Sequence, residues 1–80
     1  MDTRKAVAER ILMLCKERNI SVHMLARTSA VPPSTVKNIM NGGSKNPGIV
    51  TIKKLCDGLE ISLTDFFDTD VFRNLEQEIK

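Results

Sequence analysis

The sequence has few of the residue types on which enzymes and metal sites depend. It contains one histidine, two cysteines, and neither tryptophan nor tyrosine. His23 stands alone, and Cys15 and Cys56 lack partners at the spacing of metal ligands, so we predict no catalytic residue, no metal site and no cofactor. We interpret both cysteines as reduced, buried hydrophobic residues. The alternative, a disulfide between them, would suit a secreted protein better.

Long apolar segments are also missing. No run approaches the roughly 20 apolar residues that a membrane-spanning helix needs. Residues 1–5 lack the apolar block of a signal peptide, so we expect a cytoplasmic protein with no membrane partner. With 80 residues, the chain has room for about one small domain. An effector domain is therefore improbable, and no small-molecule ligand is evident.

The modest net charge of +2 conceals two oppositely charged parts. Residues 1–54 contain ten Lys or Arg against three Asp or Glu, a balance of +7, whereas residues 55–80 contain two against seven, a balance of −5. A basic front and an acidic back can orient a polyanion toward one face of a protein. On its own, the asymmetry is also compatible with an ordinary solvated surface.

Because no stretch alternates as a strand would, the periodic apolar residues predict an all-α fold. We expect a first helix that ends at about Arg18 and is capped by Asp2 or Thr3. A second helix of about seven residues follows, with Ser21 as its N-cap. A turn at residues 28–31 then leads to the third helix.

Two adjacent prolines open the predicted third helix. Pro32 and Pro33 suit a helix start, because a proline at the first helical position has a preset φ and no N–H to leave unsatisfied. Gly42 and Gly43 end the helix, since glycine readily takes the left-handed conformation used there. Two short helices joined by a tight turn form a helix-turn-helix arrangement.

The rest of the chain predicts three more helical segments, at about residues 49–59, at 62–67 and from Asp70 onward. Phe66 or Phe67 is expected to fill the core. We divide the chain into a domain at 1–68 and a helical extension at 69–80 that packs on the domain or mediates dimerisation. The core residues expected at 49–59 are Ile49 or Val50, Ile52, Leu55, Cys56 and Leu59. The apolar stripe of the extension consists of Val71, Phe72, Leu75 and Ile79, and it either folds back or meets a second chain.

The outward face of the third helix is polar and contains no acid. If Val36, Ile39 and Met40 point inward, Ser34, Asn38 and Asn41 lie on the opposite side with Thr35 and Lys37 on its flanks. Ser, Thr, Asn and Lys bond to base edges and phosphates, whereas an acid would repel phosphates. A solvated polar face is the alternative, but ordinary surface helices usually include acids.

A series of short matches runs along the chain in a recognisable order. It comprises Ser21-Val-His-Met-Leu25-Ala26, Val31, Ser34-Thr35-Val36, Ile39, Asn41-Gly42, Asn46-Pro47 and residues 52–67. Across about residues 5–67 the chain resembles the Cro and λ-repressor-like, or XRE, helix-turn-helix family. The resemblance implies a five-helix domain, here with a short C-terminal helix added. Its second helix crosses the DNA backbone and its third lies in the major groove.

The resemblance also implies a prokaryotic or phage transcriptional regulator that binds double-stranded DNA, commonly as a homodimer. We predict a repressor. A protein-interaction module with the same fold, such as an antitoxin or a regulatory subunit, is the alternative. By position, the base-reading residues would be Pro33, Ser34, Thr35, Lys37 and Asn38. The residues at the DNA backbone would be Ser21, His23, Asn41, Lys45 and Asn46.

Three positions depart from the family pattern. Val22 replaces a Gln that often contacts a phosphate, so one contact is missing. Ala30 replaces a glycine in the turn. If Ala30 is left-handed the cost is roughly 1 to 2 kcal/mol, and otherwise the turn has a different shape. Pro32 replaces a Ser or Thr cap, which weakens the helix start by roughly 1 kcal/mol.

Overall fold

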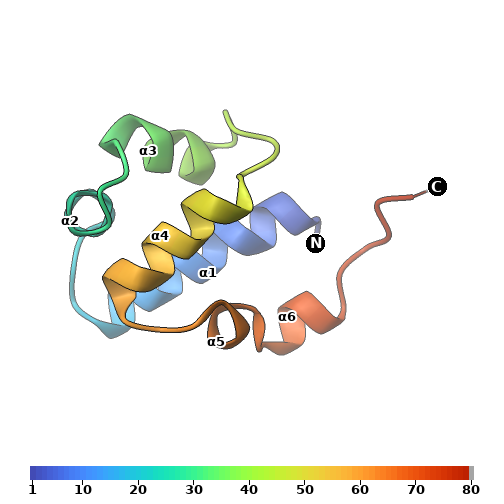
Figure 1. Ribbon diagram of the computed structural model, residues 1–80. Coiled ribbons are helices and arrows are strands. Elements are labelled where there is room, and N and C mark those ends of the chain that lie inside the picture. Colours follow the sequence, from blue (N-terminus) through green and yellow to red (C-terminus); the bar gives the residue numbers. More distant parts are fainter. Residues whose placement is uncertain (80) are drawn as a thin grey trace.

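The computed structural model describes residues 1–79, and these residues form six helices and no strand (Figure 1). The helices are α1 (Thr3–Glu17), α2 (Val22–Thr28), α3 (Pro33–Asn41), α4 (Ile49–Leu59), α5 (Leu63–Phe67) and α6 (Asp70–Arg73). The all-α prediction and the predicted order of helices are confirmed. Within the described residues, no helix has the length and apolar character needed to cross a bilayer.

Side-chain caps fix the starts of α1 and α2 as expected. The carboxylate of Asp2 accepts a hydrogen bond from the Lys5 backbone N–H at 2.8 Å, so Asp2 rather than Thr3 caps α1. The Ser21 hydroxyl accepts from the backbone N–H of Met24 at 3.0 Å. Each bond satisfies a donor that the first turn of a helix leaves free.

Helix α3 begins without a side-chain cap. Pro32 occupies the N-cap position and makes no side-chain cap bond, while Pro33 is the first helical residue. The Pro32 carbonyl accepts from the Thr35 N–H at 2.9 Å. Gly42 ends the helix in the left-handed conformation, with φ of 86°. The proline-opened helix is thus confirmed, together with the loss of its cap.

Three helices end at a left-handed residue that is not glycine. Asn19, Ala30 and Glu60 have φ of 55°, 56° and 58°. After each of them, an apolar residue donates its N–H to a carbonyl five residues earlier, which is the bond of a Schellman motif. These bonds join Ile20 to Cys15, Val31 to Ala26 and Ile61 to Cys56, each at 3.0 Å. Ala30 therefore takes the left-handed conformation and bears its strain of roughly 1 to 2 kcal/mol.

The first five helices all contribute side chains to one core. On α3, Val36 and Ile39 are buried and Met40 is half-buried, as the helical periodicity predicts. The expectation of a core residue at Ile49 or Val50 is wrong, because these side chains are 57% and 66% exposed. Ile49 lies one turn before the buried row of α4, and Val50 lies on its outer face. The buried residues of α4 are Ile52, Leu55, Cys56 and Leu59.

Arg10 ties α5 to α1. Its Nε donates to the Phe66 carbonyl at 2.8 Å and its Nη2 donates to the Asp65 carbonyl at 2.9 Å. Phe66 is fully buried, and the half-buried Phe67 packs edge-to-face with it at 4.9 Å between ring centroids. Phe66 is thus the aromatic residue that fills the core.

The C-terminal helix is much shorter than predicted. Helix α6 ends at Arg73, and its N-cap position is held by Thr69 rather than Asp70. The side-chain Nδ2 of Asn74 donates to the Asp70 carbonyl at 2.9 Å, which satisfies an acceptor at the helix end. The prediction of a longer helix after Asp70 is therefore wrong beyond its first turn.

The residues after α6 lie along the start of α1. The Glu76 N–H donates to the Met1 carbonyl at 3.4 Å, and the Thr3 hydroxyl donates to a Glu78 carboxylate oxygen at 2.8 Å. The expected helical stripe does not form, because α6 ends before Leu75 and Ile79, and Ile79 is 87% exposed. Phe72, the one aromatic residue of that set, packs edge-to-face against Phe67, with 4.9 Å between the two ring centroids.

Cys15 and Cys56 are both free and buried. Burial raises the pKa of both thiols above its ordinary value, because the charged thiolate loses solvation. Reactive thiolate is therefore scarce at neutral pH. The interpretation of both cysteines as buried core residues is confirmed.

The left-handed turn predicts a stabilising substitution. Ala30→Gly should raise the free energy of unfolding by about 1 kcal/mol, since glycine adopts a positive φ without a Cβ clash. The increase in Tm should be roughly 4 to 8 °C by thermal denaturation. Thr28→Gly, two residues earlier in the helical part of the same segment, should lower Tm instead. An unchanged or lower Tm for Ala30→Gly would contradict this account of the turn.

Candidate nucleic-acid interface

The face that α3 turns outward is set by its packing on α2 and α1. Both neighbouring helices contact α3, and Ala26 and Val36 are fully buried. The small side chain of Ala26 permits a close approach between helices. In Figure 1, α2 and α3 lie together at one end of the molecule, away from α5 and α6. The polar side of α3 is consequently left to solvent.

A second close approach holds the α2–α3 turn against α4. A Cβ atom added at Gly58 would lie 2.0 Å from the Ser29 hydroxyl oxygen, so only glycine fits there without rearrangement. That hydroxyl is buried and has no hydrogen-bond partner among the described residues. Sequence reasoning missed this contact. Its one local signal is a glycine inside an otherwise regular amphipathic helix.

The five predicted base-reading residues all belong to α3. Pro33, Ser34, Lys37 and Asn38 are exposed, and Thr35 is half-buried at the edge of the core. Ser34, Lys37 and Asn38 share the side of the helix opposite Val36 and Ile39. α3 contains no acidic residue, so this surface offers donors and a positive charge to an anionic ligand.

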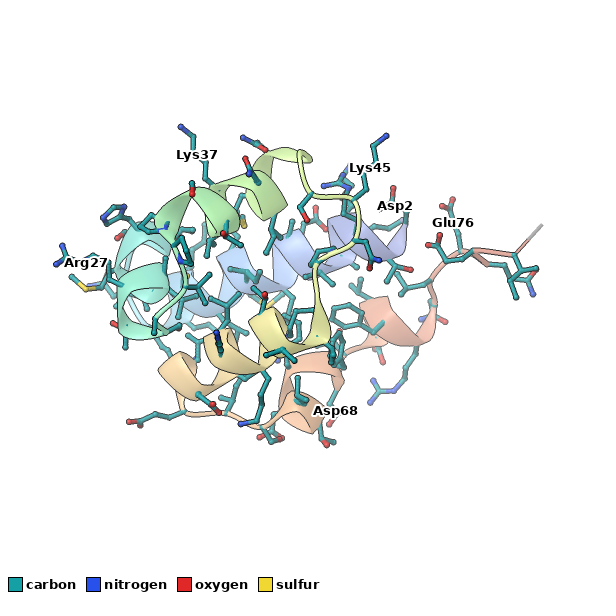
Figure 2. The ribbon with its side chains drawn as sticks, turned by 45° about the horizontal axis from the view of Figure 1, so that its top comes forward. Asp2, Arg27, Lys37, Lys45, Asp68 and Glu76 are labelled. Atoms are coloured by element: carbon teal, nitrogen blue, oxygen red, sulfur yellow. The ribbon has the colours of Figure 1, made fainter. Side chains whose placement is uncertain are left out.

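The predicted backbone-contacting residues flank that row and are all exposed. Ser21 and His23 lie at the start of α2, Asn41 lies at the end of α3, and Lys45 and Asn46 lie in the following loop. Figure 2 shows Lys37 and Lys45 pointing away from the body on the same side of the molecule, with Asp68 on the opposite side. The structure thus places two predicted cationic contacts along one edge.

Hydrogen bonds from α3 hold the loop that carries Lys45. The side-chain Oδ1 of Asn41 accepts from the Gly43 N–H at 3.1 Å. The Asn38 carbonyl accepts from the Ser44 N–H at 3.0 Å. The first bond leaves the NH2 group of the Asn41 side chain as a donor. The loop is therefore fixed relative to the polar face, which the sequence alone does not indicate.

A shallow hollow of about 530 Å³ separates α2 from α3 on the same side. Val22, Pro33 and Met40 give it a largely apolar lining, to which His23 and Lys37 also contribute. Val22 is half-buried and packs against the core. The residue that replaces the expected Gln is thus part of the hollow rather than a polar group on the surface.

The charge distribution separates the two ends of the molecule. Most acidic residues of the second half belong to the end of α4, to α5 and α6, and to the residues after them, whereas α3 has none. In Figure 1, α3 lies on one side of α1, and α5 and α6 lie on the other. A polyanion is therefore attracted to the α3 side and repelled by the far side.

Comparison with known proteins agrees with this geometry. A family model described as a Cro/C1-type HTH DNA-binding domain matches residues 10–70. The crystal structure of the prophage Lp1 protein 11 is similar over 94% of this chain and 100% of that chain, with 34% sequence identity and a TM-score of 0.82. No curated protein matches the chain.

An HTH_3 family transcriptional regulator from Vibrio cholerae is similar over 80% of this chain, with 31% identity and a TM-score of 0.72. The similarity covers 35% of that regulator, so the chain corresponds to about a third of it. The match is therefore to one part of a longer protein.

Proposed function

The chain belongs to the Cro/C1-type helix-turn-helix DNA-binding family, and we propose that it is a transcriptional repressor that reads a specific operator with α3 in the major groove. One observation carries this proposal: the burial of Val36 and Ile39 turns an acid-free row of donors outward on α3. A major groove about 12 Å wide admits a helix of this kind.

The exposed side chains of α3 have chemistry that distinguishes bases. The amide of Asn38 can pair with the N6 and N7 edge of adenine, and the ammonium of Lys37 can donate to O6 and N7 of guanine. The ring of Pro33 has no donor and offers only an apolar surface, which suits the methyl group of thymine. Ser34 and Thr35 can bond to several base edges, so they discriminate less.

The flanking residues are suited to phosphates rather than bases. Lys45 and Asn46 are exposed in a loop that α3 holds in place, and Asn41 keeps its NH2 group as a donor. Ser21 and His23 stand at the start of α2, where the Ser21 oxygen already accepts the capping bond. Such contacts fix the position of a protein on the duplex without reading its sequence.

A homodimer would supply the affinity that one reading helix lacks. The nine residues of α3 form a helix about 13 Å long. A helix of this length contacts only a few base pairs, and two half-sites about 34 Å apart double the contacts. The exposed apolar residues that could contribute to a dimer interface include Ile49, Val50, Val71 and Ile79.

Asn38→Ala should alter base preference at one position of the operator. We expect a loss of about 1 to 3 kcal/mol of discrimination there, because the bidentate pair with adenine disappears. Binding to a set of single-base operator variants measures the effect, with Asn46→Ala as the control that should weaken all variants alike. Uniform weakening by Asn38→Ala would show that Asn38 does not read a base.

Lys45→Ala should weaken binding to every DNA sequence by a similar factor. Removing one phosphate contact makes the plot of log affinity against log salt shallower by about one unit. The control is Lys54→Ala, which removes the same charge from an exposed position on α4. If the two variants gave identical slopes, Lys45 would not be a phosphate contact.

The proposed dimer predicts two chains on each operator. Sedimentation of the full chain with an excess of protein over operator duplex should give a complex of two chains per duplex. The same measurement on a duplex with one half-site should give one chain and much weaker binding. A saturated complex of one chain on the complete operator would contradict the dimer.

A further inference from the structure

We propose that Arg4, at the start of α1, is a further phosphate-binding residue of the DNA interface. The inference rests on the proposed function and extends it to a helix outside the helix-turn-helix. Motif-based reasoning did not find Arg4, because it lies outside the helix-turn-helix and just before the residues that carry the family resemblance.

The side chain of Arg4 lies at the end of the reading helix. A Cβ atom placed on Gly42 would be 3.5 Å from Nη1 of Arg4, 3.7 Å from its Cζ and 3.9 Å from its Nη2. Gly42 is the residue that ends α3. The guanidinium thus lies in contact distance of the reading helix, although α1 and α3 are separated by α2 in the sequence.

Arg4 also connects α3 to the loop that carries the predicted phosphate contacts. On one side it lines a hollow of about 240 Å³ together with Met40 and Asn41. On the other side it lines a hollow of about 390 Å³ together with Lys45 and Asn46. Arg4 therefore borders both Asn41 and Lys45, which are two of the residues expected to contact the DNA backbone.

The guanidinium has donors that the protein does not use. Within residues 1–79, it forms neither an ion pair nor a hydrogen bond, in contrast to Arg10, which bonds to carbonyls of α5, and Arg73, which pairs with Asp68 and Asp70. One acid lines each hollow, Glu9 the smaller and Glu78 the larger, and the Glu78 carboxylate accepts a hydrogen bond from Thr3. Five N–H donors in a planar group match a phosphate in two-point geometry.

The end of α3 favours a positively charged side chain even when no DNA is bound. The last carbonyls of α3 carry the negative end of the helix dipole, which favours a positive group at that end. Half-burial of the side chain limits its rotation and prepares it for binding. Bound DNA would then give the guanidinium a phosphate partner that the free protein lacks.

The test measures the salt dependence of binding of the full chain to a random-sequence duplex of about 30 base pairs, with Arg4→Gln compared with wild type. The slope of log affinity against log salt should become shallower by about 0.9. If the variant and wild type bind equally at 1 M salt, this difference makes the variant roughly eightfold weaker at 0.1 M salt. The matched control is Arg73→Gln, which removes the same charge from α6 on the other side of α1 and should leave the slope unchanged.

Arg4→Lys separates charge from packing. It keeps one positive charge at the same position, so its slope should equal that of wild type even if its stability is lower. Thermal denaturation checks that each variant is folded under the binding conditions. A slope for Arg4→Lys as shallow as that for Arg4→Gln would overturn the assignment, because the loss would then come from packing.

The outcomes also distinguish this inference from the proposed function. Equal slopes for Arg4→Gln and Arg73→Gln, with strong salt-dependent binding by wild type, would overturn the role of Arg4 and leave the proposed function intact. Absence of salt-dependent binding by wild type would overturn both. A shallower slope confined to Arg4→Gln supports the proposal.

Discussion

The burial of Val36 and Ile39 is the constraint on which the interface depends. These two side chains fix the rotation of α3 about its own axis, and that rotation decides which residues meet solvent. A polar or charged residue at either position would have to be buried without a partner, at a cost of about 1 to 3 kcal/mol or more. The acid-free row of α3 is therefore a consequence of core packing as well as of its own composition.

The turn between α2 and α3 supports this arrangement under some strain. Ala30 takes a conformation that glycine would adopt at lower cost, and the Val31 N–H closes the turn on the Ala26 carbonyl. Val31 is buried directly afterwards, so the apolar contact that accompanies such a motif holds the strained residue in place. Gly58 contributes from α4, because the absence of its side chain leaves room for Ser29. The position of α3 thus depends on three elements, of which two belong to the helix-turn-helix.

Features that depend on interactions between residues close in the sequence could be predicted, whereas features that depend on contacts between distant segments could not. The starts of α1, α2 and α3 were predictable because Asp2, Ser21 and Pro33 act on their own first turns. The residues that α3 turns toward solvent were predictable from its helical periodicity. The course of the chain after Arg73 was not, because it depends on contacts of Glu76 and Glu78 with residues at the start of the chain. The positions of Arg4 beside Gly42 and of Gly58 beside Ser29 likewise depend on how distant helices pack.

The measurement that tests the central claim most directly is chemical-shift mapping of the isotope-labelled full chain during titration with an operator duplex selected from a random pool. The account predicts saturable shifts that are largest at the start of α2, along α3 and in the loop at residues 44–48, with smaller shifts in α5 and α6. Shifts that are largest in α5 and α6, or no saturable shifts in α3, would contradict it.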